Sequence, residues 1–331
     1  MPSPPDVSVV VPTFNRAGRL RPLVGRLRAQ HAPGLDFEVL IVDNASSDAT
    51  REMVDGLIAG DVRFHYLYEP KRGASHARNA GIARARGSII AFLDDDVVPA
   101  PDWLQTLKAE FDANPGADCI GGRVDGDWPA SVPRWLTPRH LAPLALQTAR
   151  RREFDADHAS ACLITANFAC RRQVFDDVGG FSTAFMRDED REFNLRLWRA
   201  GKRGLFADDV RVVAPVDPAR LTKPYHRRWY QTTGENHARL RYREIIDADG
   251  RLVPPMTRRC VLGTPAFVYR ECLAEALRWL WSAARFRRAD AFYYECRVRY
   301  FLSYIAARAR IAACPNDRLA RNAPTRAKSP N

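Results

Sequence analysis

The sequence predicts an α/β fold in which a mostly parallel, Rossmann-like sheet is flanked by helices and followed by a helical C-terminal extension. Short β-branched runs alternate along the first half of the chain with segments whose apolar residues recur at helical spacing. This alternation indicates βαβ units, whose parallel sheets are covered by helices on both faces. Ligands of such sheets collect at the carboxyl ends of the strands. Aspartates stand at two predicted strand ends, Asp43 and 94–96.

The elements of the first half follow one another in a regular order. Strands are expected where β-branched and aromatic residues cluster, at 7–14, 37–44, 62–68 and 88–96. Two helices are expected between them, from the apolar stripes Leu20, Leu23, Val24, Leu27 and Met53, Val54, Leu57, Ile58. A third helix is expected in the segment SHARNAGIARARG.

The second half continues the sheet and then changes character. Strands are expected at 118–124, 160–172 and 205–216, and a helix at 188–201 carries an apolar stripe of Phe193, Leu197 and Trp198. The later residues are rich in arginine and aromatic side chains in a largely helical pattern. We therefore divide the chain into a catalytic domain at 1–215, a helical extension at 216–314 and a tail at 315–331 whose composition predicts disorder.

Composition narrows the classes of function. Lysine and arginine number 51 against 39 acidic residues, a net charge of +12 that favours anionic partners or serves solubility alone. Seven cysteines without a Cys-x-x-Cys pair argue against a zinc ribbon or disulfide framework and fit a reducing compartment. No signal peptide is expected, and no run of about 18 apolar residues predicts a membrane-spanning helix.

Three consecutive aspartates, Asp94, Asp95 and Asp96, follow the apolar run SIIAFL. Each close pair of carboxylates costs up to ~4 kcal/mol at about 4 Å and an effective dielectric near 20. A hard divalent cation would offset this repulsion, because Mg²⁺ and Mn²⁺ take carboxylate oxygens together with phosphate oxygens and water. In an extended strand, Asp94 and Asp96 would face one site while Asp95 faces elsewhere. The alternative is an exposed acidic turn before the next helix.

Several standard sites are not supported by the sequence. It has no Gly-x-Gly-x-x-Gly after the first strand, no Gly-x-x-x-x-Gly-Lys-Ser/Thr and no Gly-x-Ser-x-Gly. Dinucleotide binding of the usual kind, a P-loop and a hydrolase nucleophile elbow are therefore not expected.

Six motifs occur in a fixed order, namely VSVVVPTFNR, VLIVDNASSDAT, RGASHARNAG, IIAFLDDDVVPAPDWL, GGF and RDEDREFNLRLWRAG. Together they resemble the family 2 glycosyltransferases, which have the GT-A fold, over about residues 7–213. The resemblance implies transfer of a sugar from a UDP- or GDP-linked donor, with inversion and with Mn²⁺ or Mg²⁺. It also implies a bacterial cytoplasmic enzyme, or one peripheral on the inner face of the cell membrane. The acceptor would be a glycan or polyprenyl-linked lipid in surface polysaccharide or glycolipid synthesis, and no nucleic acid partner is expected.

The resemblance also assigns a nucleotide-binding role to several residues. The loop of Pro12, Thr13 and Phe14 would hold the nucleotide, with Phe14 stacking on the base. Asp43 would accept a hydrogen bond from the base N–H, and Arg78 would lie near the nucleotide. For Phe14, the alternative is an aromatic residue of the core.

The acidic residues receive the remaining roles. Asp94 would lie near the ribose and the metal, Asp95 beside the donor, and Asp96 would bind the metal that bridges the diphosphate. Asp190 would be the catalytic base, with Glu189 next to it, because single-displacement inversion needs a base on the acceptor side. The alternative for this second acidic cluster is favourable charge in the first turn of a helix.

One departure from the family concerns a histidine that often follows the last strand and serves as a further metal ligand. Ala214 stands at roughly that place here, and the nearest histidine is His226. Because His226 lies in a basic helical pattern, we expect it at the surface.

The C-terminal helices leave two alternatives open. Leu273, Leu277, Leu280 and Trp281 share one side of a helix, and aromatic residues of the next segment alternate with arginines. Tryptophan, tyrosine and arginine together suit a bilayer interface, but they also suit a helical hairpin packed on the catalytic domain. Two rival functions remain as well, a metal-dependent phosphatase using LDDDV and a polyanion-binding protein.

Overall fold

The computed structural model describes residues 3–148, 152–254 and 260–313, so the tail expected to be disordered at 315–331 lies outside the described residues. The chain forms two compact units. The first comprises Met1–Trp128 and Ala145–Val216, and the second comprises Pro129–Leu144 and Asp217–Asn331. The segment 129–144, which the sequence division assigned to the first domain, thus clusters with the helical residues.

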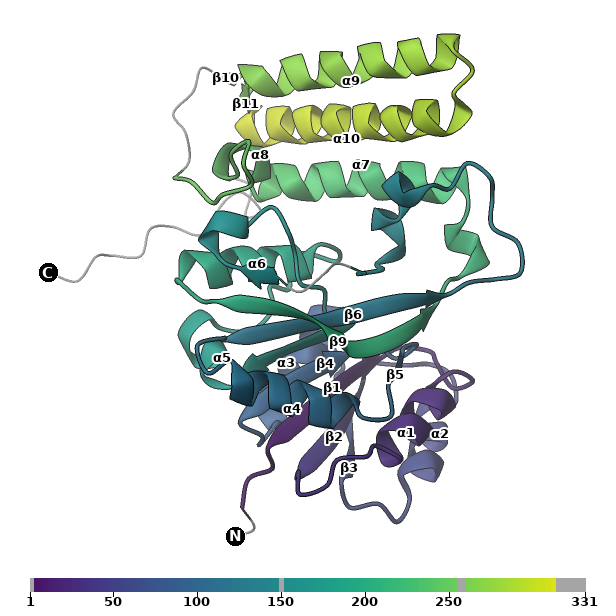
Figure 1. The fold of residues 1–331 in the computed structure, drawn as a ribbon, viewed down its shortest axis with the longest axis vertical. Coiled ribbons are helices and arrows are strands. Elements are labelled where there is room, and N and C mark those ends of the chain that lie inside the picture. The colour runs from purple at the N-terminus through teal and green to yellow at the C-terminus, as the bar shows by residue number, and fades with distance from the viewer. Residues whose placement is uncertain (1–2, 149–151, 255–259, 314–331) are drawn as a thin grey trace, which may run out of the picture. The chain divides into compact units, whose positions relative to one another are not determined.

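The first four long strands of the first unit are mutually parallel (Figure 1). They are β1 (Val7–Thr13), β2 (Phe37–Asp43), β3 (Phe64–Tyr68) and β4 (Ile89–Leu93). Strand β1 pairs with both β2 and β4, so the carboxyl ends of these three strands meet at one edge of the sheet. Every residue of β2 and of β4 is buried, as expected for strands covered on both faces.

The sheet continues in a mixed half. Its strands are β5 (Val98–Pro99), β6 (Cys119–Asp127), β7 (Arg152–Phe154), β8 (Asn167–Arg171) and β9 (Gly204–Pro215). Strand β8 is antiparallel to β4 and β6, whereas β6 and β9 are parallel. Within the described residues, nine strands form one sheet in the order β3-β2-β1-β4-β8-β6-β9-β5, with β7 also paired to β9.

Helices connect the strands of the first unit and cover the sheet. They are α1 (Leu20–Arg28), α2 (Thr50–Ile58), α3 (Ala74–Arg84), α4 (Trp103–Ala113), α5 (Gln173–Val178) and α6 (Glu189–Arg199). The stripe predicted for α1 is buried in full, and so are Phe193, Leu197 and Trp198 of α6. The predicted α/β fold is therefore confirmed.

Helix α3 lies unusually close to the sheet because of Gly81. A Cβ atom at position 81 would stand 2.3 Å from Val10 Cγ1 on β1, a separation that real side chains do not tolerate. Glycine thus allows close packing of α3 on the central strand. This packing fixes the position of Arg78, one turn earlier on the same helix.

The second unit is mainly helical. Its long helices are α7 (Lys223–Arg239), α9 (Ala266–Ala284) and α10 (Arg288–Ala313), and α10 packs against both of the others (Figure 1). The short helix α8 (Tyr242–Ile245) and the strands β10 (Cys260–Val261) and β11 (Thr264–Pro265) complete this unit. Its core includes Phe292, Tyr300, Phe301 and Tyr304 of α10. In the part of the chain that the structure describes, no helix has the length and apolar character to cross a bilayer.

The expectation that His226 lies at the surface is wrong. His226 is fully buried in α7, where its ring meets Trp135 edge-on with 5.0 Å between the centroids. The Arg-rich pattern conceals a buried stripe at helical spacing, formed by His226, Tyr230, Thr233 and His237. Burial lowers the pKa of His226 to about 4, so the side chain is neutral at pH 7.

Candidate functional site

The candidate site is built on the carboxyl ends of β1, β2 and β4. Thr13 and Asp43 are paired in register at the ends of β1 and β2, and the backbone N–H of Asn44 donates to the Thr13 carbonyl over 2.8 Å. Strand β4 ends at Leu93, directly before the three aspartates. The parallel arrangement therefore brings together residues that are about 30 and 80 positions apart in the sequence, as the strand-end argument predicted.

Asp43 is buried and held from two directions. The Tyr66 hydroxyl donates to Asp43 Oδ2 over 2.8 Å, and the Ser46 backbone N–H donates to Oδ1 over 2.9 Å. Each carboxylate oxygen can accept a second hydrogen bond. The side chain is thus fixed in orientation while it keeps acceptor capacity for a ligand.

The loop after β1 leaves Phe14 exposed, so Phe14 is not the core aromatic of the alternative interpretation. The Arg72 guanidinium lies over its ring, 5.0 Å from the centroid. The next residue, Asn15, has a left-handed backbone with φ of 53°, and its N–H donates to Ser46 Oγ. The arrangement presents an aromatic face beside the carboxyl end of β1, while Pro12 remains within the strand and half-buried.

The three aspartates lie in a turn, so the expectation that an extended strand orients them is wrong. Strand β4 ends at Leu93, and the Val97 N–H closes the turn on the Asp94 carbonyl. Asp95 nevertheless faces away from solvent, and Thr13 Oγ1 donates to its Oδ2 over 2.8 Å. Burial raises the pKa of the Asp95 carboxyl to about 6, although the Thr13 hydrogen bond and nearby Arg16 oppose the shift. Asp95 therefore ties the aspartate turn to β1.

Asp94 and Asp96 keep part of their side chains accessible, 39% and 23% respectively. Each is near an arginine, with Arg78 Nη2 at 3.1 Å from Asp94 Oδ1 and Arg16 Nη2 at 3.7 Å from Asp96 Oδ2. No group of three or more His, Cys, Asp or Glu side chains in the described ranges is placed to hold a metal ion. Two accessible carboxylates still fit Mg²⁺ or Mn²⁺, which commonly take one or two protein carboxylates and fill the shell with phosphate and water.

Arg78 joins the aspartate turn to a second acidic cluster. It is buried in α3, and its Nη1 donates to Glu189 Oε1 over 2.8 Å while Nη2 donates to Asp94. Glu189 begins α6, more than 90 residues after the aspartates in the sequence. A single guanidinium therefore connects the two carboxylate clusters that the sequence analysis singled out.

Asp190 lies in the first turn of α6, after Asp188, whose backbone is left-handed with φ of 62°. This non-glycine residue in a rarely populated conformation re-aims the chain where the acidic side chains emerge. Burial raises the pKa of Asp190 to about 7, and the charges of Glu189 and Asp188 add to the rise. Its Oδ1 accepts a 2.8 Å hydrogen bond from the Arg191 backbone N–H, so the carboxyl group is held in the first turn of α6 while its basicity is raised.

Three residues that position the site were not identified from the sequence. Arg16 is one, through its contacts with Asp95 and Asp96. Asn44 is another, because its amide spans the loops by donating to the Lys71 carbonyl and accepting from the Gly73 N–H. The third, Asn79, exchanges hydrogen bonds of 2.8 Å with the backbone of Phe181 and so ties α3 to the GGF motif. Each of the three is a polar residue within one of the six family motifs, and this position in a motif is the sequence signal that marks them.

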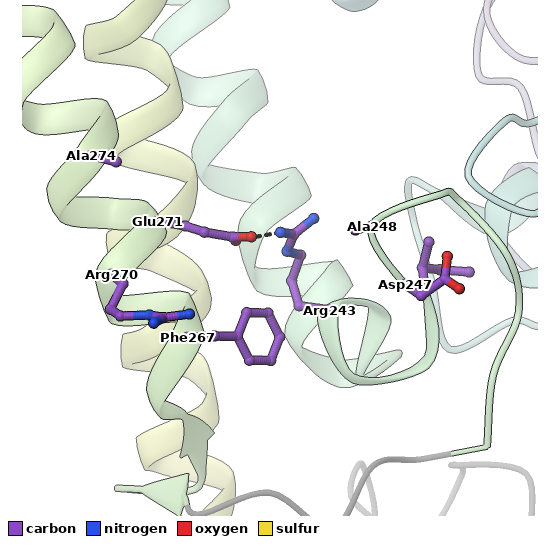
Figure 2. A pocket seen from close by; sticks show the side chains of 8 residues that line it. Arg243, Asp247, Ala248, Phe267, Arg270, Glu271 and Ala274 are labelled. Atoms are coloured by element: carbon purple, nitrogen blue, oxygen red, sulfur yellow. Dashed lines mark hydrogen bonds and ion pairs between the residues drawn. The ribbon is translucent and has the colours of Figure 1, made fainter.

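The second unit contains a separate pocket of about 620 Å³ (Figure 2). It lies among α8, the residues after it and α9, and Glu271 reaches across to Arg243. Its lining comprises Arg243, Ile246, Asp247, Ala248, Phe267, Arg270, Glu271 and Ala274. None of these residues is among the predicted catalytic, nucleotide-binding or metal-binding residues.

Comparisons with known proteins identify the family and the fold. The family model described as "Glycosyl transferase family 2" matches residues 8–179. Glycosyltransferase AglE of Haloferax volcanii is 29% identical over 215 residues, which are 65% of this chain and 68% of that protein. A glucosyl-dolichyl phosphate glucuronosyltransferase of the same organism is 29% identical over 218 residues, with 62% and 68% covered.

A solved structure shows the likeness of fold over nearly the whole chain. The mannosyltransferase PcManGT from Pyrobaculum calidifontis, in complex with GDP-Man and Mn²⁺, superposes with a TM-score of 0.62 at 21% sequence identity. The match covers 96% of this chain and 89% of that one. At this level of identity the likeness bears on the fold alone.

Proposed function

This chain belongs to glycosyl transferase family 2 and has the GT-A fold, and we propose that it transfers a sugar from a UDP- or GDP-linked donor to an acceptor hydroxyl with inversion. The observation that carries the proposal is the Arg78 bridge between Asp94 and Glu189. A transferase of this kind must hold the leaving diphosphate and the base that activates the acceptor in fixed positions on opposite sides of the anomeric carbon. One buried guanidinium joins the residues proposed for these two tasks.

The donor nucleotide would bind at the ends of β1 and β2. Phe14 offers an exposed aromatic face on which a base can stack, and such stacking contributes about 1–3 kcal/mol per base. Asp43 retains acceptor capacity for the base N–H, because each oxygen has one hydrogen bond from the protein. Thr13 and Asp95 hold each other behind this surface and so keep the loop in place.

Asp96 and Asp94 would hold a divalent cation, Mn²⁺ or Mg²⁺, together with the donor diphosphate. When bound, such a cation supplies positive charge that stabilises the leaving nucleoside diphosphate. Arg16 and Arg78 flank the same carboxylates and add positive charge at this end of the sheet. They also lower the electrostatic cost of three adjacent aspartates when the donor is absent.

Asp190 would act as the base that removes the acceptor proton. Its pKa of about 7 lies near neutral pH, where a general base is both deprotonated and strong enough to accept a proton. Glu189 is engaged by Arg78 and so would orient the first turn of α6. The two neighbouring carboxylates thus have different environments, which suits different roles for Asp190 and Glu189.

The acceptor we propose is a glycan or a polyprenyl-linked lipid, in the synthesis of a surface polysaccharide or glycolipid. One relative carries glucosyl-dolichyl phosphate in its name, which supports a lipid-linked acceptor. Membership of the family favours the transferase over a metal-dependent phosphatase and over a polyanion-binding protein. Peripheral contact with an anionic membrane belongs to the same proposal.

A thermal-shift panel of UDP- and GDP-sugars with Mn²⁺ and Mg²⁺ tests the donor. A ligand at 100 times its dissociation constant stabilises the protein by ~2.7 kcal/mol, which produces a measurable rise in melting temperature. The proposal predicts that one nucleotide class, with metal, gives the largest rise. If no nucleotide-sugar shifts the transition and nucleic acid binds tightly in a salt-sensitive manner, the polyanion-binding protein is the better interpretation.

A further inference from the structure

Helix α9 carries an apolar stripe that the second unit does not cover. Leu273, Leu277, Leu280 and Trp281 are 61%, 58%, 62% and 51% exposed. Their spacing of four, three and one residues places them on one face of a helix with 3.6 residues per turn. Contiguous exposed apolar side chains of this kind indicate an interaction surface, whereas single exposed residues do not.

The opposite face of α9 holds the helix in its unit. Its buried residues are Val268, Glu275 and Ser282, spaced by seven, and they lie about 180° around the helix from the stripe. The helix packs extensively on α10. The stripe is therefore an outward face of a folded helix, and its side chains can be changed without opening the core.

Positive charge surrounds the C-terminal end of the stripe. The stretch 276–289 contains Arg278, Arg285, Arg287 and Arg288 and has no aspartate or glutamate. The guanidinium carbons of Arg285 and Arg287 lie 4.4 and 5.3 Å from the Trp281 ring centroid. Phe286, between them, is 85% exposed. Two aromatic side chains are thus set among arginines at the turn between α9 and α10.

The acidic side chains of α9 do not offset this charge, because both are engaged within the unit. Glu271 binds Arg243, as Figure 2 shows. Glu275 is buried, with Arg278 and Arg297 each at 3.3 Å from its Oε1. The outward face of α9 is consequently apolar from Leu273 to Trp281 and basic at its C-terminal end.

We propose that this face of α9, with the turn at 285–288, docks on the surface of a bilayer that contains anionic lipids. A helix with an apolar face, a tryptophan and flanking arginines inserts shallowly at the level of the headgroups. Arginines near such a surface are attracted by the anionic headgroups, and the attraction falls with salt. The proposal rests on the proposed function in one respect: a lipid-linked acceptor would be met at this surface.

A second copy of the chain is a poorer occupant than a membrane. Pairing two α9 faces would bury the stripe, but the arginines would then need acidic partners on the facing helix. The two acidic side chains of α9 are already bound to Arg243, Arg278 and Arg297. A bilayer with anionic lipids supplies complementary charge through its headgroups and an apolar phase through its acyl chains.

Flotation of the full chain with vesicles tests the proposal. Vesicles of phosphatidylcholine mixed with phosphatidylglycerol should carry the protein upward at low salt. Pure phosphatidylcholine vesicles, or mixed vesicles at high salt, should leave most of it behind. Donor, metal and acceptor are omitted, so the result does not depend on transferase activity.

Two variants separate the apolar and the charged contributions. Leu277→Gln/Leu280→Gln should weaken partitioning at least about tenfold, because two leucines no longer leave water. Arg285→Gln/Arg287→Gln/Arg288→Gln should weaken it about a hundredfold, at about fivefold for each arginine. Their matched controls, Val62→Gln/Met186→Gln and Arg19→Gln/Arg21→Gln/Arg84→Gln, change exposed residues of the first unit and should bind like the parent.

Every outcome decides between docking and its alternatives. Wild-type protein that stays with the unbound fraction at low salt overturns the proposal, as does equal loss of binding in variants and controls. A dimer in size-exclusion chromatography that the Leu277→Gln/Leu280→Gln variant abolishes assigns the stripe to a second copy and also overturns it. Retained nucleotide binding without vesicle binding removes the docking surface but leaves the proposed transferase intact. Thermal unfolding curves that match the parent show that the variants remain folded.

Discussion

Arg78 on α3 and Glu189 on α6 are joined by a 2.8 Å hydrogen bond between a buried guanidinium and a half-buried carboxylate, while the other arm of the same guanidinium reaches Asp94. The two acids lie 95 positions apart in the chain. Arginine suits this task because its planar fork addresses two carboxylates in fixed directions. Arg78 thus ties the aspartate turn to the first turn of α6, which carries the proposed base Asp190.

Loss of this bridge should affect both stability and activity. Arg78→Gln leaves Glu189 without its cation, and leaving a half-buried hydrogen-bonding group unsatisfied costs about 1–3 kcal/mol. Arg84→Gln, an exposed change on the same helix, is the matched control. Chemical denaturation and turnover measured on both variants check this, and equal stability of the two would contradict the bridge.

Removal of the proposed base should slow the reaction without weakening donor binding. Asp190→Asn should lower kcat by ~10²–10⁴, the range typical of lost acid–base catalysis. Titration calorimetry with the nucleotide-sugar should give an unchanged Kd. Asp176→Asn, an exposed change on α5, should retain full turnover. A variant at position 190 that keeps its rate at saturating donor, but loses donor affinity, would reassign the residue to binding.

The raised pKa of Asp190 makes a prediction about stability. The carboxyl titrates at about 7 in the folded protein against 3.8 in the unfolded chain. Between about pH 4 and 7 the unfolded state therefore ionises first, and this group lowers the free energy of unfolding as pH rises. Asp190→Asn should gain melting temperature over the parent across that window and hold the gain above about pH 7.

Melting curves of Asp190→Asn, Asp176→Asn and the parent at a series of pH values measure this difference. Asp176→Asn serves as the control for loss of a carboxylate at an exposed position. A constant difference for Asp190→Asn would show that its carboxyl titrates normally.

Metal removal should weaken binding of the nucleoside diphosphate. Asp96→Asn is expected to reduce Mn²⁺-dependent affinity for UDP or GDP and to remove most activity, with the fold preserved, because one hard oxygen ligand is lost. Asp102→Asn, an exposed change six residues later, serves as the control. Isothermal titration with and without EDTA provides the measurement, and full turnover of Asp96→Asn in EDTA would exclude the metal role.

Local sequence pattern was sufficient for β1, β2, the buried run of β4 and helix α1, whereas the strand expected at 160–172 is a strand only at Asn167–Arg171. The β-branched runs that became β1, β2 and β4 are buried, and the four apolar residues of α1 face the core. Asp43 occupies the last residue of its strand, as expected. These features depend on residues within a few positions of one another, which periodicity records directly.

Features that depend on distant partners were not predictable in the same way. The Asp95 contact with Thr13 joins residues 82 positions apart, and the turn at 94–96 replaces the extended strand assumed for the aspartates. The basic neighbours of His226 predict a position at the surface, yet the helix buries the face that carries it. The helical spacing of His226, Tyr230, Thr233 and His237 within α7 indicates the buried face, whereas the basic composition of the segment does not.

Gly81 has a consequence for anyone who searches for improved or altered variants of this protein. Any side chain at position 81 would collide with Val10 and push α3 away from β1. Arg78 would move with the helix, so its reach to Asp94 and Glu189 would change although no proposed site residue had been replaced. Random libraries should therefore return inactive Gly81 variants among their apparent catalytic mutants, and directed libraries gain by holding this position constant.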